Sequence, residues 1–270
     1  MRPKPAKRDL RDNSGAMLNA NPDALPALAL LHGFLGSAQD WDALIAQVSP
    51  QARCRAIDLP GHGAALACLG PDYTMPGAAE RVARQCQALE RPFLYGYSMG
   101  GRLALHMTCQ GLLPVRALIL ESCNAGLVDD AAERAARDDA WADRFDAEPL
   151  ADVLQDWYRQ PVFATLGQGT AFSERVTSRL GGSGAELARS LRGMSVGRQT
   201  PLWSALPTLK LPVLLIAGER DTAYVDCMQR MADLCPRAEM RIVLGAGHNV
   251  HAEQPAELHA IVSQFLRKHT

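Results

Sequence analysis

The stretch PFLYGYSMGGRLAL, residues 92–105, decides the fold that we expect for this chain. An apolar run leads into Gly96-Tyr97-Ser98-Met99-Gly100, and a helical pattern follows over 101–110. This order of strand, Gly-x-Ser-x-Gly turn and helix is that of a nucleophile elbow, where a sharp turn raises a serine above the end of a buried strand. A serine that lies in a glycine-rich turn by chance would give the same sequence pattern, but the flanking strand and helix favour the elbow.

Further short apolar runs, mostly bounded by Gly or Pro, lie on both sides of this stretch. Such runs are typical of strands buried on both faces of a parallel sheet. Helical patterns lie between several of them, so we expect an α/β fold with a mostly parallel central sheet, flanking helices and right-handed crossovers. The runs lie within residues 27–31, 53–63, 93–98, 115–122, 212–221 and 239–249.

One long segment interrupts this alternation. Residues 126–206 read as helices without a convincing strand, which predicts an inserted helical lid over the strand ends, where parallel sheets bind ligands. Residues 26–125 and 207–270 are then the core. The opening residues, 1–25, are predicted to be a flexible N-terminal extension.

The composition narrows the function classes. A chain of 270 residues can hold one large domain, or one domain with an insertion. Its net charge of -1 favours neither nucleic acid nor a membrane surface as a partner, and we expect no membrane span and no secretory signal. Seven cysteines without a spacing pattern indicate reduced thiols and a cytoplasmic protein. The oligomeric state is left open.

A serine hydroxyl becomes a nucleophile or base only when a histidine takes its proton. His248 lies in a glycine-rich loop after the last predicted strand, where the chain order of serine, acid and histidine places the base for Ser98. The strand end LLIAGERD offers Glu219 and Asp221 as the acid that orients the imidazole. We favour Asp221 because the loop starts there; Asp226 is an alternative, and a helix-capping role would also explain an aspartate at 221.

The other histidines fit this role less well. His251 follows His248 by three residues and is predicted to lie on a helix surface. His32 and His62 lie in turns after strands, from which they could line the pocket. The remaining three have helical positions: His106, His259 and His269.

An oxyanion site is also predicted. The backbone amide of Met99 would lie at a helix N-terminus, next to the serine. HGFLG, residues 32–36, follows the first strand and fits the loop that supplies a second amide, for which we favour Phe34. A simple tight turn is the alternative interpretation.

Taken together, the motifs HGFLG, DLPGHG, GYSMGG, GERD and GAGH resemble the α/β-hydrolase superfamily from about residue 27 onward. A narrower resemblance rests on GYSMGGRLAL, WYRQPVFATL, RLGGSGAELA, GERD and AGHNVHAEQP. These segments are similar to the family of 2-succinyl-6-hydroxy-2,4-cyclohexadiene-1-carboxylate synthases, lyases of menaquinone biosynthesis. That resemblance implies elimination of pyruvate from 2-succinyl-5-enolpyruvyl-6-hydroxy-3-cyclohexene-1-carboxylate, by a triad that abstracts a proton and needs neither metal nor organic cofactor.

The resemblance also implies site residues. The triad would be Ser98, Asp221 and His248. The substrate would carry three carboxylates, which suits arginine because its planar guanidinium can bind a carboxylate through two hydrogen bonds. The implied substrate-binding residues are Tyr97, Arg102, Arg137, Trp157 and Arg179, with Arg134 as an alternative to Arg137.

Other functions remain open on the residues alone. A carboxylesterase or thioesterase would use the same triad through an acyl-enzyme, and a ligand receptor on this scaffold is a further alternative. Surface arginines are common on helices such as RAARDDAWADR, where opposite charges alternate, so each lid arginine taken singly fits a solvated position as well. Convergence of the arginines on one pocket would favour the polycarboxylate substrate.

Overall fold

Six parallel strands form the centre of the protein, in the order β2-β1-β3-β4-β5-β6. The computed structural model describes residues 25–66, 68–166 and 170–270, so the predicted N-terminal extension lies outside the described residues except for Leu25. The inner strands β1, β3, β4 and β5 are buried along their whole length, which confirms the prediction of a parallel sheet covered on both faces. The strands are β1 (Ala27–Leu31), β2 (Arg53–Ile57), β3 (Phe93–Tyr97), β4 (Ala117–Glu121), β5 (Val213–Gly218) and β6 (Ala238–Val243).

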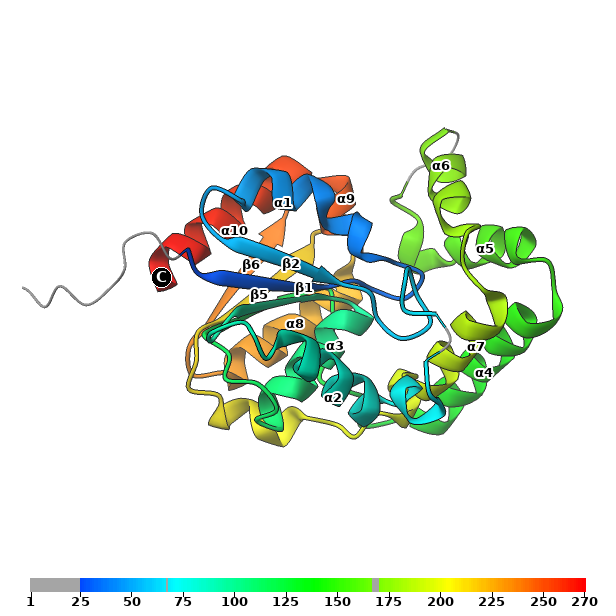
Figure 1. Cartoon of the computed structure of the whole chain (residues 1–270), viewed down its shortest axis with the longest axis horizontal. Coiled ribbons are helices and arrows are strands. Elements are labelled where there is room, and N and C mark those ends of the chain that lie inside the picture. The colour runs from blue at the N-terminus through cyan, green and yellow to red at the C-terminus, as the bar shows by residue number, and fades with distance from the viewer. Residues whose placement is uncertain (1–24, 67, 167–169) are drawn as a thin grey trace, which may run out of the picture.

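Helices cover both faces of this sheet. Successive strand residues point to opposite faces, so Leu28 and Leu30 of β1 join one apolar cluster, while Ala29 and Leu31 join the other. In Figure 1, α1 (Asp42–Val48), α9 (Val250–Glu253) and α10 (Pro255–His269) lie above the sheet. The helices α2 (Met75–Cys86), α3 (Met99–Cys109) and α8 (Thr222–Leu234) lie below it.

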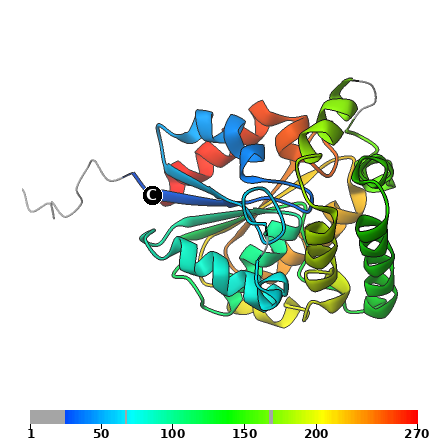
Figure 2. The ribbon, with the colours of Figure 1, turned by 45° about the vertical axis from the view of Figure 1, so that its right-hand side comes forward.

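Between β4 and β5 the chain forms a helical insertion. Within the described residues, the segment from Glu121 to Val213 contains no further strand. Figures 1 and 2 show the insertion as a separate layer beyond one end of the sheet. The boundaries 126–206 predicted for a lid remain a prediction. The helices of the insertion are α4 (Ala131–Ala147), α5 (Leu150–Tyr158), α6 (Thr170–Arg179) and α7 (Gly184–Gly193).

An apolar cluster of its own holds the insertion to the core. Phe145 of α4, Leu154 of α5 and Leu187 of α7 are buried together with Leu35, which belongs to the loop after β1. Burying these side chains against a core loop ties the helices to the strand ends by the hydrophobic effect. The insertion therefore covers the edge of the sheet where a parallel fold places its ligands.

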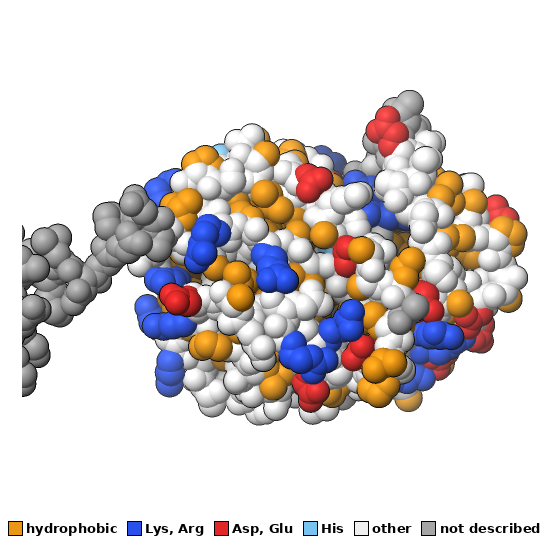
Figure 3. Space-filling model, viewed as in Figure 1, with side chains coloured by type: hydrophobic (Ala, Val, Ile, Leu, Met, Phe, Trp, Pro, Cys, Tyr) orange, Lys and Arg blue, Asp and Glu red, His pale blue; other side chains and the backbone are white. Residues whose placement is uncertain are grey.

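The outer surface of the insertion is charged. Arg192 of α7 pairs with Asp143 and Asp146 of α4, at 2.5 and 2.7 Å, and Arg198 pairs with Asp139 at 2.6 Å. On the face shown in Figure 3, basic and acidic side chains lie next to each other over this part of the molecule. The alternating charges of α4 are thus used in solvent-exposed pairs between helices. Of the helices in the described part of the chain, none has the length and apolar character to cross a membrane.

Candidate active site

The turn between β3 and α3 holds Ser98 in a strained conformation. Its φ of 49° and ψ of -110° lie in a region that side chains with a Cβ rarely adopt. The turn is possible because its neighbours are glycines: a Cβ on Gly96 would lie 2.6 Å from the Cα of Gly101, and one on Gly100 would lie 2.7 Å from the carbonyl carbon of Leu31. The structure thus has the close approach of strand and helix that a nucleophile elbow requires.

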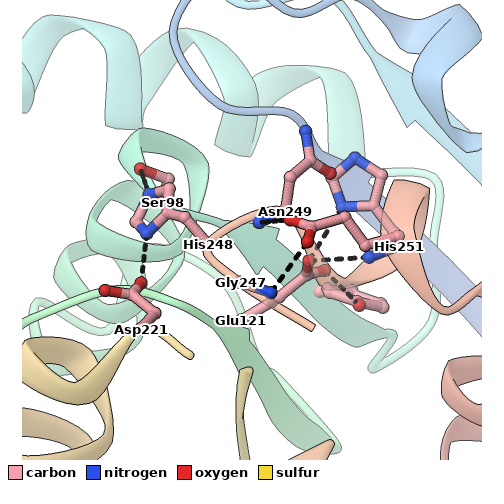
Figure 4. A network of polar contacts seen from close by, with 9 residues as sticks. Ser98, Glu121, Asp221, Gly247, His248, Asn249 and His251 are labelled. Atoms are coloured by element: carbon pink, nitrogen blue, oxygen red, sulfur yellow. Dashed lines mark hydrogen bonds and ion pairs between the residues drawn. The ribbon is translucent and has the colours of Figure 1, made fainter. Parts of the chain in front are cut away.

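His248 joins this serine to an acid. Nε2 of His248 lies 3.1 Å from Oγ of Ser98, and Nδ1 lies 2.6 Å from Oδ2 of Asp221 (Figure 4). Asp221 is held at the start of α8, where its amide donates to the carbonyl of Gly218. The alternative acid Glu219 is engaged elsewhere, because its carboxylate accepts the amide hydrogen of Gly245. The three side chains form a chain of hydrogen bonds that can move a proton away from the serine.

The loop after β1 places Phe34, the residue predicted to supply a second oxyanion amide, on the wall of the same cavity. Phe34 and Met99 both line the cavity into which Ser98 opens, and Met99 is the first residue of α3. Leu35 has a φ of 65°, and its amide donates to Nε2 of His62 at 3.1 Å. This contact fixes the turn that carries Phe34.

His32 and His62 hold the loops behind the cavity. Nε2 of His32 accepts the amide hydrogen of Leu59, and the two imidazole rings lie 5.1 Å apart. Burial lowers the pKa of His32, and it lowers the pKa of His62 to about 3, so both rings stay neutral acceptors. The prediction that they could line the pocket needs correction: neither lines the cavity of Ser98, although His62 borders a smaller one of about 280 Å³.

The cavity above Ser98 has a volume of about 540 Å³ and is bounded by both the core and the insertion. Tyr97, directly before the serine, is buried at its base, and its ring lies 5.5 Å from that of His248. Trp157 of α5 contacts the ring of Phe34 at 4.8 Å. Both were predicted substrate-binding residues, and both line the cavity. The indole Nε1 of Trp157 is buried without a hydrogen-bond partner in the described structure.

Arg102 lines the cavity one turn along α3 from Ser98. Its guanidinium donates to the side-chain oxygen of Gln199 and to the carbonyl of Met194, both at 2.8 Å. Both acceptors are neutral, and burial lowers the pKa of Arg102 to about 10. Among the described residues, no carboxylate forms an ion pair with it. A fixed guanidinium whose hydrogen-bond acceptors are neutral attracts an anionic ligand.

Three further arginines line the same cavity. Arg134 and Arg137 of α4 both line the cavity. From the sequence they were alternatives for one substrate-binding position, and the structure places both at the same cavity. Arg134 is paired with Asp138 at 2.9 Å. Arg220, in the turn after β5, also lines the cavity and was missed. Its position directly before Asp221 was the available signal, since residues flanking a catalytic acid share its edge of the sheet.

Arg179 lies elsewhere. At the end of α6, it pairs with Asp40 of the core at 2.5 Å and lines the smaller cavity of about 280 Å³. Its contact with substrate carboxylates stays a prediction, and in this structure its guanidinium is paired with Asp40. The ion pair instead joins the insertion to the core.

His251 is not on a helix surface, which corrects the expectation from sequence. Its side chain is 7% exposed, and its Nδ1 lies 2.9 Å from Oε1 of Glu121, which is 0% exposed (Figure 4). Glu121, the last residue of β4, also accepts a hydrogen bond from the hydroxyl of Tyr95 at 2.6 Å. Burial alone would raise the pKa of Glu121, but the contacts with His251 and Tyr95 outweigh it and lower this pKa. The sequence feature that could have predicted this pair is the glutamate at the end of an otherwise apolar strand.

The fold, the elbow and the hydrogen-bonded triad define an enzyme of the α/β-hydrolase class, and comparison with known proteins agrees. The profile of the "Alpha/beta hydrolase family" matches residues 28–261. The chain is 38% identical to the 2-succinyl-6-hydroxy-2,4-cyclohexadiene-1-carboxylate synthase of Serratia proteamaculans over 244 residues, covering 89% of this chain and 93% of that one.

Two other relatives give the same result. Identity to the synthase of the same name from Klebsiella pneumoniae is 34%, over 94% of this chain and 98% of that one. The structure of MenH from S. aureus superposes with a TM-score of 0.87 at 30% identity, covering 93% and 96% of the two chains. The chain belongs to the alpha/beta hydrolase family and, within it, to the family of 2-succinyl-6-hydroxy-2,4-cyclohexadiene-1-carboxylate synthases.

Proposed function

We propose that this enzyme is a lyase of menaquinone biosynthesis. It eliminates pyruvate from 2-succinyl-5-enolpyruvyl-6-hydroxy-3-cyclohexene-1-carboxylate and leaves 2-succinyl-6-hydroxy-2,4-cyclohexadiene-1-carboxylate. The names of its relatives support this reaction. The observation that carries it in this chain is that a hydrogen-bonded serine opens into a cavity lined by arginines, as a substrate with several carboxylates requires.

The catalytic roles follow from the geometry of the triad. His248, oriented by Asp221, accepts the hydroxyl proton of Ser98. The serine alkoxide then removes a proton from the ring carbon beside the succinyl ketone, and the electron pair moves into a dienolate. The dienolate expels the enolpyruvyl group, which leaves as the enolate of pyruvate and takes a proton from the imidazolium of His248. The ring gains a conjugated diene, and no acyl-enzyme forms.

Stabilisation of the dienolate oxygen is the task of two backbone amides. We assign this role to the amides of Phe34 and Met99 because both residues line the cavity with Ser98, and Met99, the first residue of α3, adds the positive end of the helix dipole. Because these donors are fixed before the substrate binds, they need no reorganisation when negative charge develops. This preorganisation would lower the barrier to proton abstraction.

We assign binding of the substrate to the cationic wall of the cavity, which consists of Arg102, Arg134, Arg137 and Arg220. Arg102 presents a guanidinium held by neutral acceptors, while Arg134 and Arg137 face the same cavity from α4. Tyr97 and Trp157 supply aromatic surface for the ring of the substrate. Holding the carboxylates in this way would orient the acidic C–H toward Ser98, and orientation is a large part of catalysis.

A coupled assay tests the proposal. Lactate dehydrogenase would report pyruvate released from the enolpyruvyl cyclohexene substrate, beside a nitrophenyl ester and with Ser98→Ala as the control. We expect fast pyruvate release that is lost in Ser98→Ala, with negligible ester cleavage. Ester cleavage without pyruvate would overturn the lyase in favour of an esterase or thioesterase with the same triad. Pyruvate release that persists in Ser98→Ala would overturn the role of the serine.

The setting of the enzyme is part of the proposal. A small-molecule polycarboxylate is the expected partner, without nucleic acid or membrane. A cytoplasmic location is supported by the cysteines, because all seven lie in the described residues and have free thiols.

A further inference from the structure

A second histidine–carboxylate pair lies behind the triad. Oε1 of Glu121 lies 2.9 Å from Nδ1 of His251 and also accepts the backbone amide hydrogen of the same residue at 3.0 Å. Both polar groups of His251 that face the core are therefore held by one carboxylate oxygen. The other oxygen of Glu121 is held by Tyr95, and the ring of Trp41 lies 4.8 Å from that of His251. This combination leaves His251 little freedom to move.

The same glutamate is bonded to the nucleophile. The carbonyl oxygen of Glu121 accepts the amide hydrogen of Ser98 at 2.9 Å. Glu121 therefore contacts Ser98 through its backbone, and it contacts the residue three positions after His248 through its side chain. The ring of Tyr97 contacts both imidazoles, and its centroid lies 5.5 Å from that of His248 and 4.7 Å from that of His251. Glu121 thus joins the nucleophile to His251, which follows the base by three positions.

A second carboxylate holds the loop of His248 itself. The amides on both sides of His248, those of Gly247 and Asn249, donate to the two oxygens of Glu253 at 2.8 and 3.2 Å (Figure 4). Glu253 and His251 both belong to α9, the short helix that follows the loop. When α9 is held in place, the loop that carries His248 is held with it.

Burying a carboxylate together with a histidine is an expensive way to stabilise a fold. Well-packed apolar residues of the same volume usually serve stability as well or better. A carboxylate instead adds geometric specificity, because its hydrogen bonds fix the positions of the donor atoms that it binds. Glu121 is bonded to Ser98, and His251 lies three positions after His248 in the chain, which indicates that the fixed geometry of the pair is used at the triad.

We propose that His251, anchored by Glu121, is a positioning residue that holds His248 at the distance from Ser98 needed for proton transfer. The inference rests on the catalytic roles proposed above for Ser98 and His248. A misplacement of about 1 Å at a reacting group can cost about 100-fold in rate. His251 does not line the cavity of Ser98, and by this proposal it does not touch the substrate. Replacing its side chain should therefore affect kcat rather than KM.

The experiment compares three variants of the whole chain. His251→Leu removes the side-chain bond from Nδ1 to Glu121 and keeps the backbone amide bond, whereas His251→Asn keeps a side-chain donor close to the position of Nδ1. Val262→Ala shortens a side chain of α10 that is buried among apolar neighbours, and it serves as a control for lost stability. Two readouts are taken: steady-state pyruvate release, and the downfield proton resonance of the hydrogen bond between His248 and Asp221. The resonance needs no substrate, so it tests the inference even if the proposed reaction fails.

The expected pattern is specific. His251→Leu should lower kcat about 10- to 100-fold with little change in KM, and it should shift or broaden the resonance. His251→Asn should restore most of both signals, while Val262→Ala should leave both unchanged. Wild-type kcat and resonance in His251→Leu would overturn the inference, as would an equal loss in Val262→Ala. If His251→Leu does not fold, Glu121→Gln, which keeps the volume, replaces it with the same expectations.

Discussion

Oγ of Ser98 and Nε2 of His248 lie 3.1 Å apart, although 150 positions of the chain separate the two residues. The contact forms because all six strands are parallel, so the turn after β3 and the loop after β6 emerge at the same edge of the sheet. The acid reaches the same place from the turn after β5. Three strand ends thus build one site, and each can be tested separately.

Replacing Asp221 with asparagine should lower kcat for pyruvate release about 10⁴-fold with little change in KM. Oδ2 of Asp221 accepts the Nδ1 proton of His248, whereas an amide can present its NH₂ group there and stabilise the wrong tautomer. Steady-state kinetics measure the loss. Asp226→Asn, which changes the other aspartate considered for this role, should leave kcat unchanged; a comparable loss there would contradict the assignment.

Arg102→Ala should raise KM for the polycarboxylate substrate about 10- to 100-fold, because a hydrogen-bonded charge on the substrate loses its partner. Arg102→Lys should recover only part of the affinity, since an ammonium cannot replace the two bonds of a guanidinium to Gln199 and Met194. Initial rates over a range of substrate concentrations give both values. Arg84→Ala, which changes an exposed arginine of α2, is the control. Equal effects of the two alanine variants would show that Arg102 has no specific role.

Gly100→Ala should destabilise the fold by about 3 kcal/mol or prevent folding, because its Cβ would lie 2.7 Å from the backbone of Leu31. The matched control is Gly70→Ala, where an added Cβ has no neighbour within 4 Å in the described structure. Denaturant midpoints of the two variants provide the comparison. Similar midpoints would mean that the strand and helix of the elbow are not packed as closely as described.

The free energy of unfolding should fall as the pH drops from about 6.5 toward 3, by up to about 1.4 kcal/mol per pH unit for His62 alone. Burial lowers the pKa of this imidazole from 6.5 to about 3 in the folded protein. Between those values the unfolded chain binds a proton that the folded chain does not, so lower pH favours unfolding. The nearby His32 acts in the same direction.

Denaturant titrations at several pH values measure this slope. His62→Gln keeps an oxygen close to the position of Nε2 that can accept the amide hydrogen of Leu35, but it removes the titrating ring. The slope should be smaller in that variant. An unchanged slope would mean that other groups cause the acid sensitivity.

Much of this architecture was predictable from local patterns. A strand buried on both faces is a short apolar run whatever its partners, so the runs identified six strands, and β1 matches its predicted range residue for residue. The elbow was predictable because its strain is local: it needs glycines beside Ser98, and they are neighbours in the chain. His248 and Asp221 followed from the chain order of the motif.

The sequence by itself therefore determined the strands and the elbow, and it favoured Ser98, Asp221 and His248 for the triad, because each of these features is encoded by a motif of residues close together in the chain. Only the tertiary structure decided which distant charges meet. Arg179 pairs with Asp40, 139 positions away, and Glu121 pairs with His251, 130 positions away. No periodicity links such partners, since the energy of an ion pair depends on distance and burial in the folded chain. The cationic wall of the cavity and the second carboxylate behind the triad exist only once the sheet and its insertion are packed.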